Sequence, residues 1–285
     1  MSDHLWIQVH DVEHGACTII WSSVTSRLAM IDSGDNSTTG WRPSTYIRHK
    51  LNRTELDFLF ITNADQDHLS DLQGLWDHGV NVSILYRNWS PQPATLRAIK
   101  EEQCDLSKDI ERYLMMHETY TEIAGLEFNN SMGGATFKAF ANSYPEFSDT
   151  NNLSLAVFIT YGSFKMLFPG DLEKAGWKRL LQNPYFVEEL RGTQILMASH
   201  HGRENGFCQE IFNYFTPRAV VISDKPIIHS TQETVPDYRA VVIPDGVVVS
   251  GEQRRRHVLT TRCDGNVVFE VYPDGSFKVL THTVA

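Results

Sequence analysis

The residues of this chain best suited to chemistry lie in one short segment. Four groups that can bind a cation, Asn63, Asp65, Asp67 and His68, lie within six residues, directly after the apolar run 56–61. Carboxylates packed this closely at the end of a strand are costly unless a cation neutralises their charge. The segment therefore indicates a metal site. An acidic surface turn that caps the following helix is the alternative, and this segment alone does not decide between the two.

Further candidate groups recur along the chain. Each comes shortly after a run of strand-forming residues: Asp171, His200, His201 and His229. Active sites are commonly assembled at strand ends, because the sheet holds the connecting loops rigid. Taken singly, these residues have ordinary explanations, since G-D is a common turn and a lone histidine is usually a surface or core residue. Their joint order, a D-x-D-H cluster, then G-D, then H-H-G, then H, favours one shared site.

The elements that must hold these groups alternate strands with helices. Strands are predicted over 6–12, 17–21, 28–32, 56–61, 82–86, 135–140, 153–159, 164–168, 194–198 and 219–223, with hairpin strands over 245–281. Helices are predicted over 41–52, 70–78, 95–118 with an interruption near 104–107, and 173–182. Two β-rich halves of this kind predict a layered sandwich with helices outside the sheets. We expect one domain over residues 1–285, with a helical insertion at about 90–130.

Composition narrows the setting. The chain has 285 residues, 41% of them hydrophobic, which is enough for a sizeable core. It contains no apolar run of about 18 residues and does not begin like a signal peptide, so we expect a cytoplasmic protein without membrane attachment. A formal net charge of −10 argues against a general nucleic-acid coat. The four cysteines form no C-x-x-C pair, which argues against a thiolate zinc site.

The order of these motifs resembles the metallo-β-lactamase superfamily, and the details are most similar to the hydrolase domain of DNA-uptake competence (ComEC-type) proteins. The resemblance runs from about residue 5 to residue 281. It is carried by 11–17 with 31–34 (family pattern DVGQGD…LIDxG), 63–68 (HPDxDH), 168–172 (LxGDL), and 199–202 with Ser223 and His229 (HHGS…S…H). It implies an α+β fold, the four-layer αββα metallo-β-lactamase-like sandwich.

The resemblance also implies two metal positions, and the chain departs from the family at the first. Asn63 and Asp65 stand where the family's H-x-H-x-D-H turn has histidines. No histidine stands where the middle ligand falls, and Asn151 and Asn152 lie roughly there. The first site is therefore expected to use oxygen donors or to be lost. Oxygen donors suit Mn²⁺ or Mg²⁺ better than Zn²⁺.

For the second metal position the family pattern is more complete. The residues that the resemblance assigns to it are Asp67, His68, Asp171 and His229. Asp171 would bridge the two ions, and Asp67 would also orient the attacking water. We therefore expect a divalent metal, Zn²⁺ or Mn²⁺, as one or two ions, with a labile ion at the first position if two are bound.

Other residues are expected to support the metal site. One of His200 and His201 would donate a proton to the leaving group, because hydrolysis needs a general acid as well as a nucleophile. His200 directly follows the predicted strand, which favours His201 for the metal-facing or acid role. Asp32 and Ser223 are expected to stand behind the ligands and to hold the acidic turn in place.

The predicted function follows from this metal chemistry. A cation lowers the pKa of its bound water to about 7 and so supplies hydroxide at neutral pH. The interpretation favoured here is a metal-dependent phosphodiesterase or nuclease, acting on a phosphoester or nucleic acid. The alternative is a catalytically degenerate member that serves as a binding or regulatory module, and a third possibility is an acyl, lactam or thioester hydrolase. The sequence decides neither a protein partner nor an oligomeric state.

Overall fold

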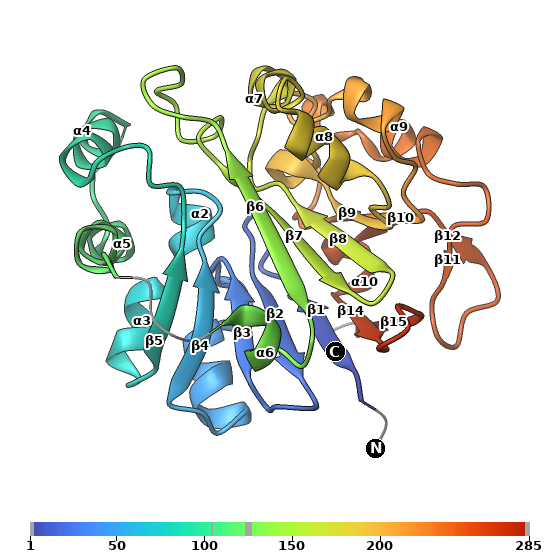
Figure 1. The fold of residues 1–285 in the computed structure, drawn as a ribbon, viewed down its shortest axis with the longest axis horizontal. Coiled ribbons are helices and arrows are strands. Elements are labelled where there is room, and N and C mark those ends of the chain that lie inside the picture. The colour runs from blue at the N-terminus through green and yellow to red at the C-terminus, as the bar shows by residue number, and fades with distance from the viewer. Residues whose placement is uncertain (1–2, 104, 123–126, 283–285) are drawn as a thin grey trace.

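The computed structural model, which describes residues 3–103, 105–122 and 127–282, contains two β-sheets that face each other (Figure 1). The first sheet has seven strands, in the order β15 (Phe277–His282), β14 (Asn266–Val271), β1 (Leu5–Val9), β2 (Thr18–Ser22), β3 (Leu28–Ile31), β4 (Glu55–Phe60) and β5 (Asn81–Tyr86). The second sheet has six, in the order β13 (Val258–Thr260), β10 (Ala219–Ile222), β9 (Ile195–Met197), β8 (Phe164–Phe168), β7 (Leu155–Tyr161) and β6 (Thr136–Ala141). The strands β11 (Val247–Val248) and β12 (Arg255–Arg256) form a small separate ribbon.

Helices cover the outer faces of both sheets (Figure 1). Those on the side of the first sheet are α1 (Pro43–Thr45), the π-helix η1 (Tyr46–Lys50), α2 (Gln66–Leu69), α3 (Leu72–Asp77), α4 (Pro93–Gln103) and α5 (Lys108–Thr119). Those on the side of the second sheet are α7 (Lys174–Leu180), α8 (Pro184–Leu190), the 3-10 helix η3 (Gln209–Asn213) and α9 (Val235–Ala240). The short turns are α6 (Phe128–Ser131), α10 (Thr261–Asp264), η2 (Ser199–Gly202) and η4 (Ser230–Gln232).

The layering follows from strands that are apolar on both faces. In β4, Phe58 and Phe60 point into the core between the sheets, whereas Leu59 points toward the helices outside. In β7, Val157 joins the same central core and Phe158 packs under the helices of the other side. Side chains alternate between the faces of a strand, so each strand contributes to two apolar layers. The result is the four-layer αββα sandwich that the sequence predicts, and the fold class is confirmed.

The arrangement of the central strands brings the candidate residues together. Strands β3, β4 and β5 run parallel to one another in the first sheet, and β8, β9, β10 and β13 do so in the second. Parallel strands place their carboxyl ends at the same edge of a sheet. The loops after β3, β4, β8, β9 and β10 therefore meet at one edge of the sandwich, and these loops carry the predicted site residues.

The elements agree with the sequence prediction in part. The helix predicted over 95–118 with an interruption near 104–107 corresponds to α4 and α5, and Ser107 caps the start of α5 by accepting a hydrogen bond from the backbone N–H of Ile110. Helix α8 was not predicted, although Asn183 at its N-cap and Pro184 in its first turn are helix-start signals. Within the C-terminal region, β14 and β15 form a hairpin on β1, whereas β13 pairs in parallel with β10.

The predicted helical insertion contains α4 and α5, and α5 packs against α2, α3 and α4. Positions 104 and 123–126 of that segment lie outside the described residues. Among the residues that are described, every helix is too short or too polar to span a lipid bilayer.

Candidate metal centre

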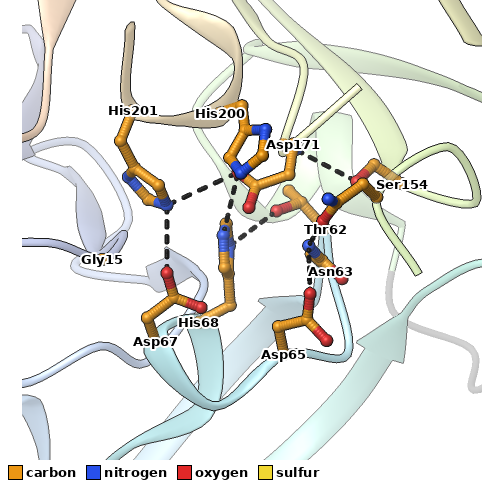
Figure 2. Close-up of polar contacts among 12 residues, drawn as sticks. Gly15, Thr62, Asn63, Asp65, Asp67, His68, Ser154, Asp171, His200 and His201 are labelled. Atoms are coloured by element: carbon orange, nitrogen blue, oxygen red, sulfur yellow. Dashed lines mark hydrogen bonds and ion pairs between the residues drawn. The ribbon is translucent and has the colours of Figure 1, made fainter. Parts of the chain in front are cut away.

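Four side chains from three loops converge at this edge of the sandwich (Figure 2). They are Asp67, His68, Asp171 and His201, and each offers one ligand atom within 4.8 Å of the others. His201 Nε2 lies 3.3 Å from Asp67 Oδ2 and 3.5 Å from Asp171 Oδ1, and His68 Nε2 lies 3.1 Å from the same Asp171 oxygen. Two imidazoles and two carboxylates that face one point are a donor set suited to a divalent transition metal.

An unusual backbone conformation aims His201 at the cluster. His200 and His201 have φ values of 51° and 53°, in the left-handed region that residues other than glycine seldom adopt. The backbone N–H of His200 donates to Gly170 O at 3.2 Å, and the Ser199 hydroxyl donates to Leu172 O at 2.5 Å. Such conformations persist where surrounding contacts hold them, and they are enriched at functional sites.

The orientation of His68 is fixed from behind by Asp32. Asp32 Oδ2 lies 2.9 Å from His68 Nδ1, while the carboxylate also accepts from the backbone N–H of Thr62 at 2.7 Å and from its hydroxyl at 2.5 Å. A carboxylate bound to Nδ1 leaves Nε2 facing forward, which is the arrangement that supports metal-binding histidines. Asp32 thus lies where the sequence analysis expects a supporting residue.

The residues present fit a cation. His68 Nε2, Asp171 Oδ1 and His201 Nε2 are all buried and have no hydrogen-bond partner, although they lie within ion-pair distance of one another. Buried polar atoms are normally paired, so atoms left without a hydrogen bond need an explanation. A cavity of about 30 Å³ is lined by these same three residues, which is room for an ion or a water molecule. A metal ion at this point would satisfy all three atoms.

Charge at the cluster supports the same interpretation. Burial opposes ionisation of Asp67 and Asp171, yet the neighbouring histidines hold the pKa of both carboxyls well below the usual range. Burial likewise opposes protonation of His68 and His201, yet the carboxylates raise the pKa of both imidazoles. Positive charge on the neighbouring imidazoles is thus what favours ionisation of the two carboxylates. That positive charge is what a divalent cation would supply in their place.

A hydrogen bond between Ser223 and Gly15 holds the loop after β1 in place beside the cluster. The Ser223 hydroxyl donates to Gly15 O at 2.7 Å, which joins the end of β10 to the loop after β1. A Cβ atom on Gly15 would lie 2.5 Å from the backbone oxygen of Asp67, so only glycine allows this approach. Ser223 therefore supports the acidic turn through the loop rather than by touching a ligand side chain.

Two residues at the rim were not singled out by sequence reasoning. His14 Nε2 lies 3.6 Å from Asp67 Oδ2, and its ring centroid is 4.4 Å from that of His201. Arg203 Nη2 donates to His14 Nε2 at 3.1 Å, and Arg203 Nε is buried without a hydrogen-bond partner. Burial, together with the charge of His201, lowers the pKa of His14 to about 4. The signal for Arg203 was its place directly after H-H-G, where the family pattern has serine.

Two predicted residues lie outside the cluster. His200 turns away, with Nδ1 3.7 Å from Glu173 Oε1, and burial lowers its pKa. His229, expected as the fourth ligand of the second site, is exposed and accepts a hydrogen bond from the backbone N–H of Gln232. After β10 the chain passes over the surface through 225–232, so His229 does not reach the ligands. The structure brings His201 to the position expected for His229, which corrects that assignment.

The predicted first site is organised differently. Asp65 Oδ1 lies 2.5 Å from Lys100 Nζ, and both carboxylate oxygens accept from the Thr150 hydroxyl at 2.9 and 3.0 Å. Asn63 Nδ2 contacts Asp65 Oδ2 at 3.3 Å and Asn151 Oδ1 at 3.2 Å. In Figure 2, Asn63 and Asp65 lie to one side of the Asp67–His201 pair. They do not join the four-residue cluster.

Comparisons with known proteins agree with this fold. Residues 10–184 match the family model described as the Metallo-beta-lactamase superfamily. ComE operon protein 3 of Bacillus subtilis (strain 168) is 24% identical over 173 residues, which are 59% of this chain and 20% of that protein. This chain therefore spans about a fifth of the length of that relative.

Two solved structures are similar in fold. A variant of the CmlA β-hydroxylase has a TM-score of 0.50 and 14% identity, over 95% of this chain and 54% of its own. The metallo-beta-lactamase fold protein YhfI of Bacillus subtilis has a TM-score of 0.47 and 12% identity, over 92% of this chain and 98% of its own.

Proposed function

The chain belongs to the metallo-β-lactamase superfamily, and from this premise we propose that it is a metal-dependent hydrolase of phosphoesters, of the phosphodiesterase or nuclease type. The observation that carries the proposal is the buried cluster of Asp67, His68, Asp171 and His201, in which three ligand atoms have no hydrogen-bond partner. The proposed cofactor is Zn²⁺ or Mn²⁺. Once bound, such a cation lowers the pKa of water to about 7 and polarises a phosphoryl oxygen.

The four side chains differ in exposure, and we propose different roles for them on that basis. The side chains of His68, Asp171 and His201 are 1–4% exposed, whereas that of Asp67 is 28% exposed. Substrate therefore approaches from the side of Asp67. We propose that the three buried groups bind the metal, and that Asp67 both binds it and orients the attacking water.

The rim beside Asp67 supports an anionic substrate. Arg203 contacts His14, which in turn contacts Asp67, so a guanidinium stands at the approach to the cluster. Arginine is suited to phosphate because its planar donors can bind two oxygens at once. We propose that Arg203 binds a non-bridging oxygen of the phosphoester. His14, neutral at pH 7 because its pKa is lowered to about 4, holds the guanidinium by accepting its hydrogen bond.

The role of general acid narrows to one predicted residue. His201 is proposed as a ligand, so a proton donor must be sought elsewhere. His200 is the remaining predicted histidine, but its ring lies toward Glu173 and burial lowers its pKa, and both features favour proton donation by solvent. His200→Gln is expected to lower kcat with the metal content unchanged if this residue donates the proton. An unchanged kcat in His200→Gln would show that solvent, and not His200, donates the proton.

A substrate panel tests the proposed activity. Purified protein loaded with Mn²⁺ or Zn²⁺ would be assayed on a chromogenic phosphodiester, single-stranded and duplex DNA, RNA, cyclic nucleotides, a thioester and a lactam. Hydrolysis of a phosphodiester by the wild type that is lost in Asp67→Ala supports the proposal. Asp245→Ala, which removes an exposed carboxylate, is the matched control and should keep full activity. Turnover of only the thioester or the lactam would overturn the phosphoester assignment.

One observation favours a second candidate function, a non-catalytic binding or regulatory module. Asp65 of the predicted first site is held by Lys100 rather than being free for an ion. A protein that binds metal at the four-residue cluster yet turns over no member of the panel would support this candidate.

A further inference from the structure

A buried ammonium group lies at the predicted first metal site. The Lys100 side chain, on α4, is only 3% exposed, and its Nζ lies 2.5 Å from Asp65 Oδ1 and 3.1 Å from Gln103 Oε1. A lysine is almost never buried this deeply unless it is paired. Asp65 is the paired carboxylate, and it belongs to the same turn as the proposed ligands Asp67 and His68.

We propose that Lys100 supplies the positive charge that a first metal ion would otherwise provide, so that the centre holds one metal ion and not two. The ammonium neutralises Asp65 and opposes the entry of a second cation beside it, because like charges repel strongly where water is excluded. This proposal deepens the function proposed above, since it rests on a metal bound at the four-residue cluster and fixes the number of ions.

The other predicted donors are engaged in part, since the Asn63 amide nitrogen makes hydrogen bonds while Asn63 Oδ1 is buried without a partner. Asn63 directs its amide nitrogen toward Asp65 and Asn151, and Asn151 in turn donates to Glu173 Oε1 at 3.2 Å. The Thr150 hydroxyl donates to Asp65. An ion at this position would have to displace Lys100 and separate Asp65 from its hydrogen-bond donors.

Lys100 reaches the predicted first site from another part of the chain. The residue comes from α4, in the predicted helical insertion, and reaches Asp65 across 35 residues of sequence. The insertion therefore supplies a cation from outside the four-layer sandwich. Among the described residues, the ion pairs of the second site's four ligands are made with carboxylates and histidines, and none of them includes a lysine.

Metal stoichiometry tests the proposal. Wild type, the paired variant Asp65→Asn/Lys100→Met and the control Asp67→Asn would be stripped with chelator, titrated with Mn²⁺ and with Zn²⁺, and measured by elemental analysis and calorimetry. One ion per chain is expected in the wild type and in the paired variant, with dissociation constants within about threefold of each other. Asp67→Asn should bind at least about tenfold more weakly, because it loses a ligand. Two ions per wild-type chain, or loss of the ion in the paired variant, would overturn the proposal.

Unfolding of the metal-free protein tests the ion pair without depending on metal. Asp65→Asn leaves the buried ammonium without its partner, and Lys100→Met leaves the half-buried Asp65 carboxylate without its partner, so each should lower the denaturant midpoint. The paired variant should recover part of that loss, which marks coupling between the two positions. If the midpoint shift of the paired variant equals the sum of the shifts of the two single variants, Lys100 does not neutralise Asp65. If the wild type binds no ion but the two positions remain coupled, the proposed hydrolase site is wrong. The ion pair between Lys100 and Asp65 is still supported in that case.

Discussion

Two halves of a single turn take opposite roles in this molecule. Asp67 and His68 face a point where three buried ligand atoms without hydrogen-bond partners converge, whereas Asp65 is held by an ammonium group and Asn63 has one unpaired atom, Oδ1. Their residue types are similar, and they lie within six positions of one another. The difference teaches that a metal site is marked by several unpaired donor atoms that converge on one point with no lysine beside them, and that residue type and spacing alone do not identify it.

The largest expected effect comes from removing a ligand of the cluster. Asp67→Ala and Asp171→Ala should each lower kcat/KM by about 10³-fold or more, because a charge that holds the metal is lost. Steady-state kinetics on the phosphodiester of the panel, with metal content measured on the same samples, would check this. Substantial activity in Asp67→Ala would show that hydrolysis arises at another site. Asp67 and His68 would then not be the catalytic half of the turn.

Weakening the support behind a ligand should have a smaller effect. Asp32→Asn keeps the shape of the side chain but loses the charge facing His68 Nδ1, so metal affinity should fall about 10- to 100-fold. Asparagine is also tolerated at the positive φ of 58° found at this position. Calorimetric titration with Zn²⁺ measures the effect. Unchanged affinity would mean that Asp32 does not orient His68.

Arg203 should affect substrate rather than metal. Arg203→Ala is expected to raise KM for a phosphodiester about tenfold, because one charge-assisted hydrogen bond at a partly exposed rim is lost. The metal content should not change. Arg254→Ala, which removes an exposed arginine paired with Glu252, is the matched control. An equal KM for Arg203→Ala and wild type would show that Arg203 does not bind the substrate, and Arg203 would no longer support a phosphoester as the substrate class.

The smallest effect is expected where the sequence departs most visibly from the family. Asn63→His restores a family ligand type, yet Lys100 still neutralises Asp65, so the stoichiometry should stay at one ion per chain. Elemental analysis after Zn²⁺ loading measures this. A rise toward two ions would show that Asn63, and not Lys100, is what keeps the first position empty of metal.

Much of the fold was accessible from the sequence for physical reasons. Strands buried on both faces, such as 56–61, leave continuous apolar runs, and loops at their carboxyl ends carry polar clusters. Asp67, His68 and Asp171 were found because each follows such a strand within a few residues. The interruption near 104–107 that separates α4 from α5 was predicted, and attention to the helix-start signals Asn183 and Pro184 also predicts α8.

The remaining features depend on distance in the chain and on backbone conformation. His201, rather than His229, completes the cluster because of a left-handed turn that no residue type announces. Lys100 reaches Asp65 from a helix 35 residues away, and nothing local distinguishes it from a solvent-exposed lysine of the same helix. Arg203 and His14 are 189 residues apart in the chain. Such contacts are set by tertiary packing, so a single sequence does not reveal them.

The central claim is that one divalent cation is held by Asp67, His68, Asp171 and His201 while the neighbouring position is filled by Lys100. The most direct test is a crystal structure with anomalous difference maps recorded at the absorption edges of zinc and manganese. A single peak about 2.0–2.3 Å from donor atoms of these four residues, with Lys100 still paired to Asp65, is the predicted result. A peak between Asn63 and Asp65, or no peak at the four-residue cluster in crystals loaded with metal, would contradict it.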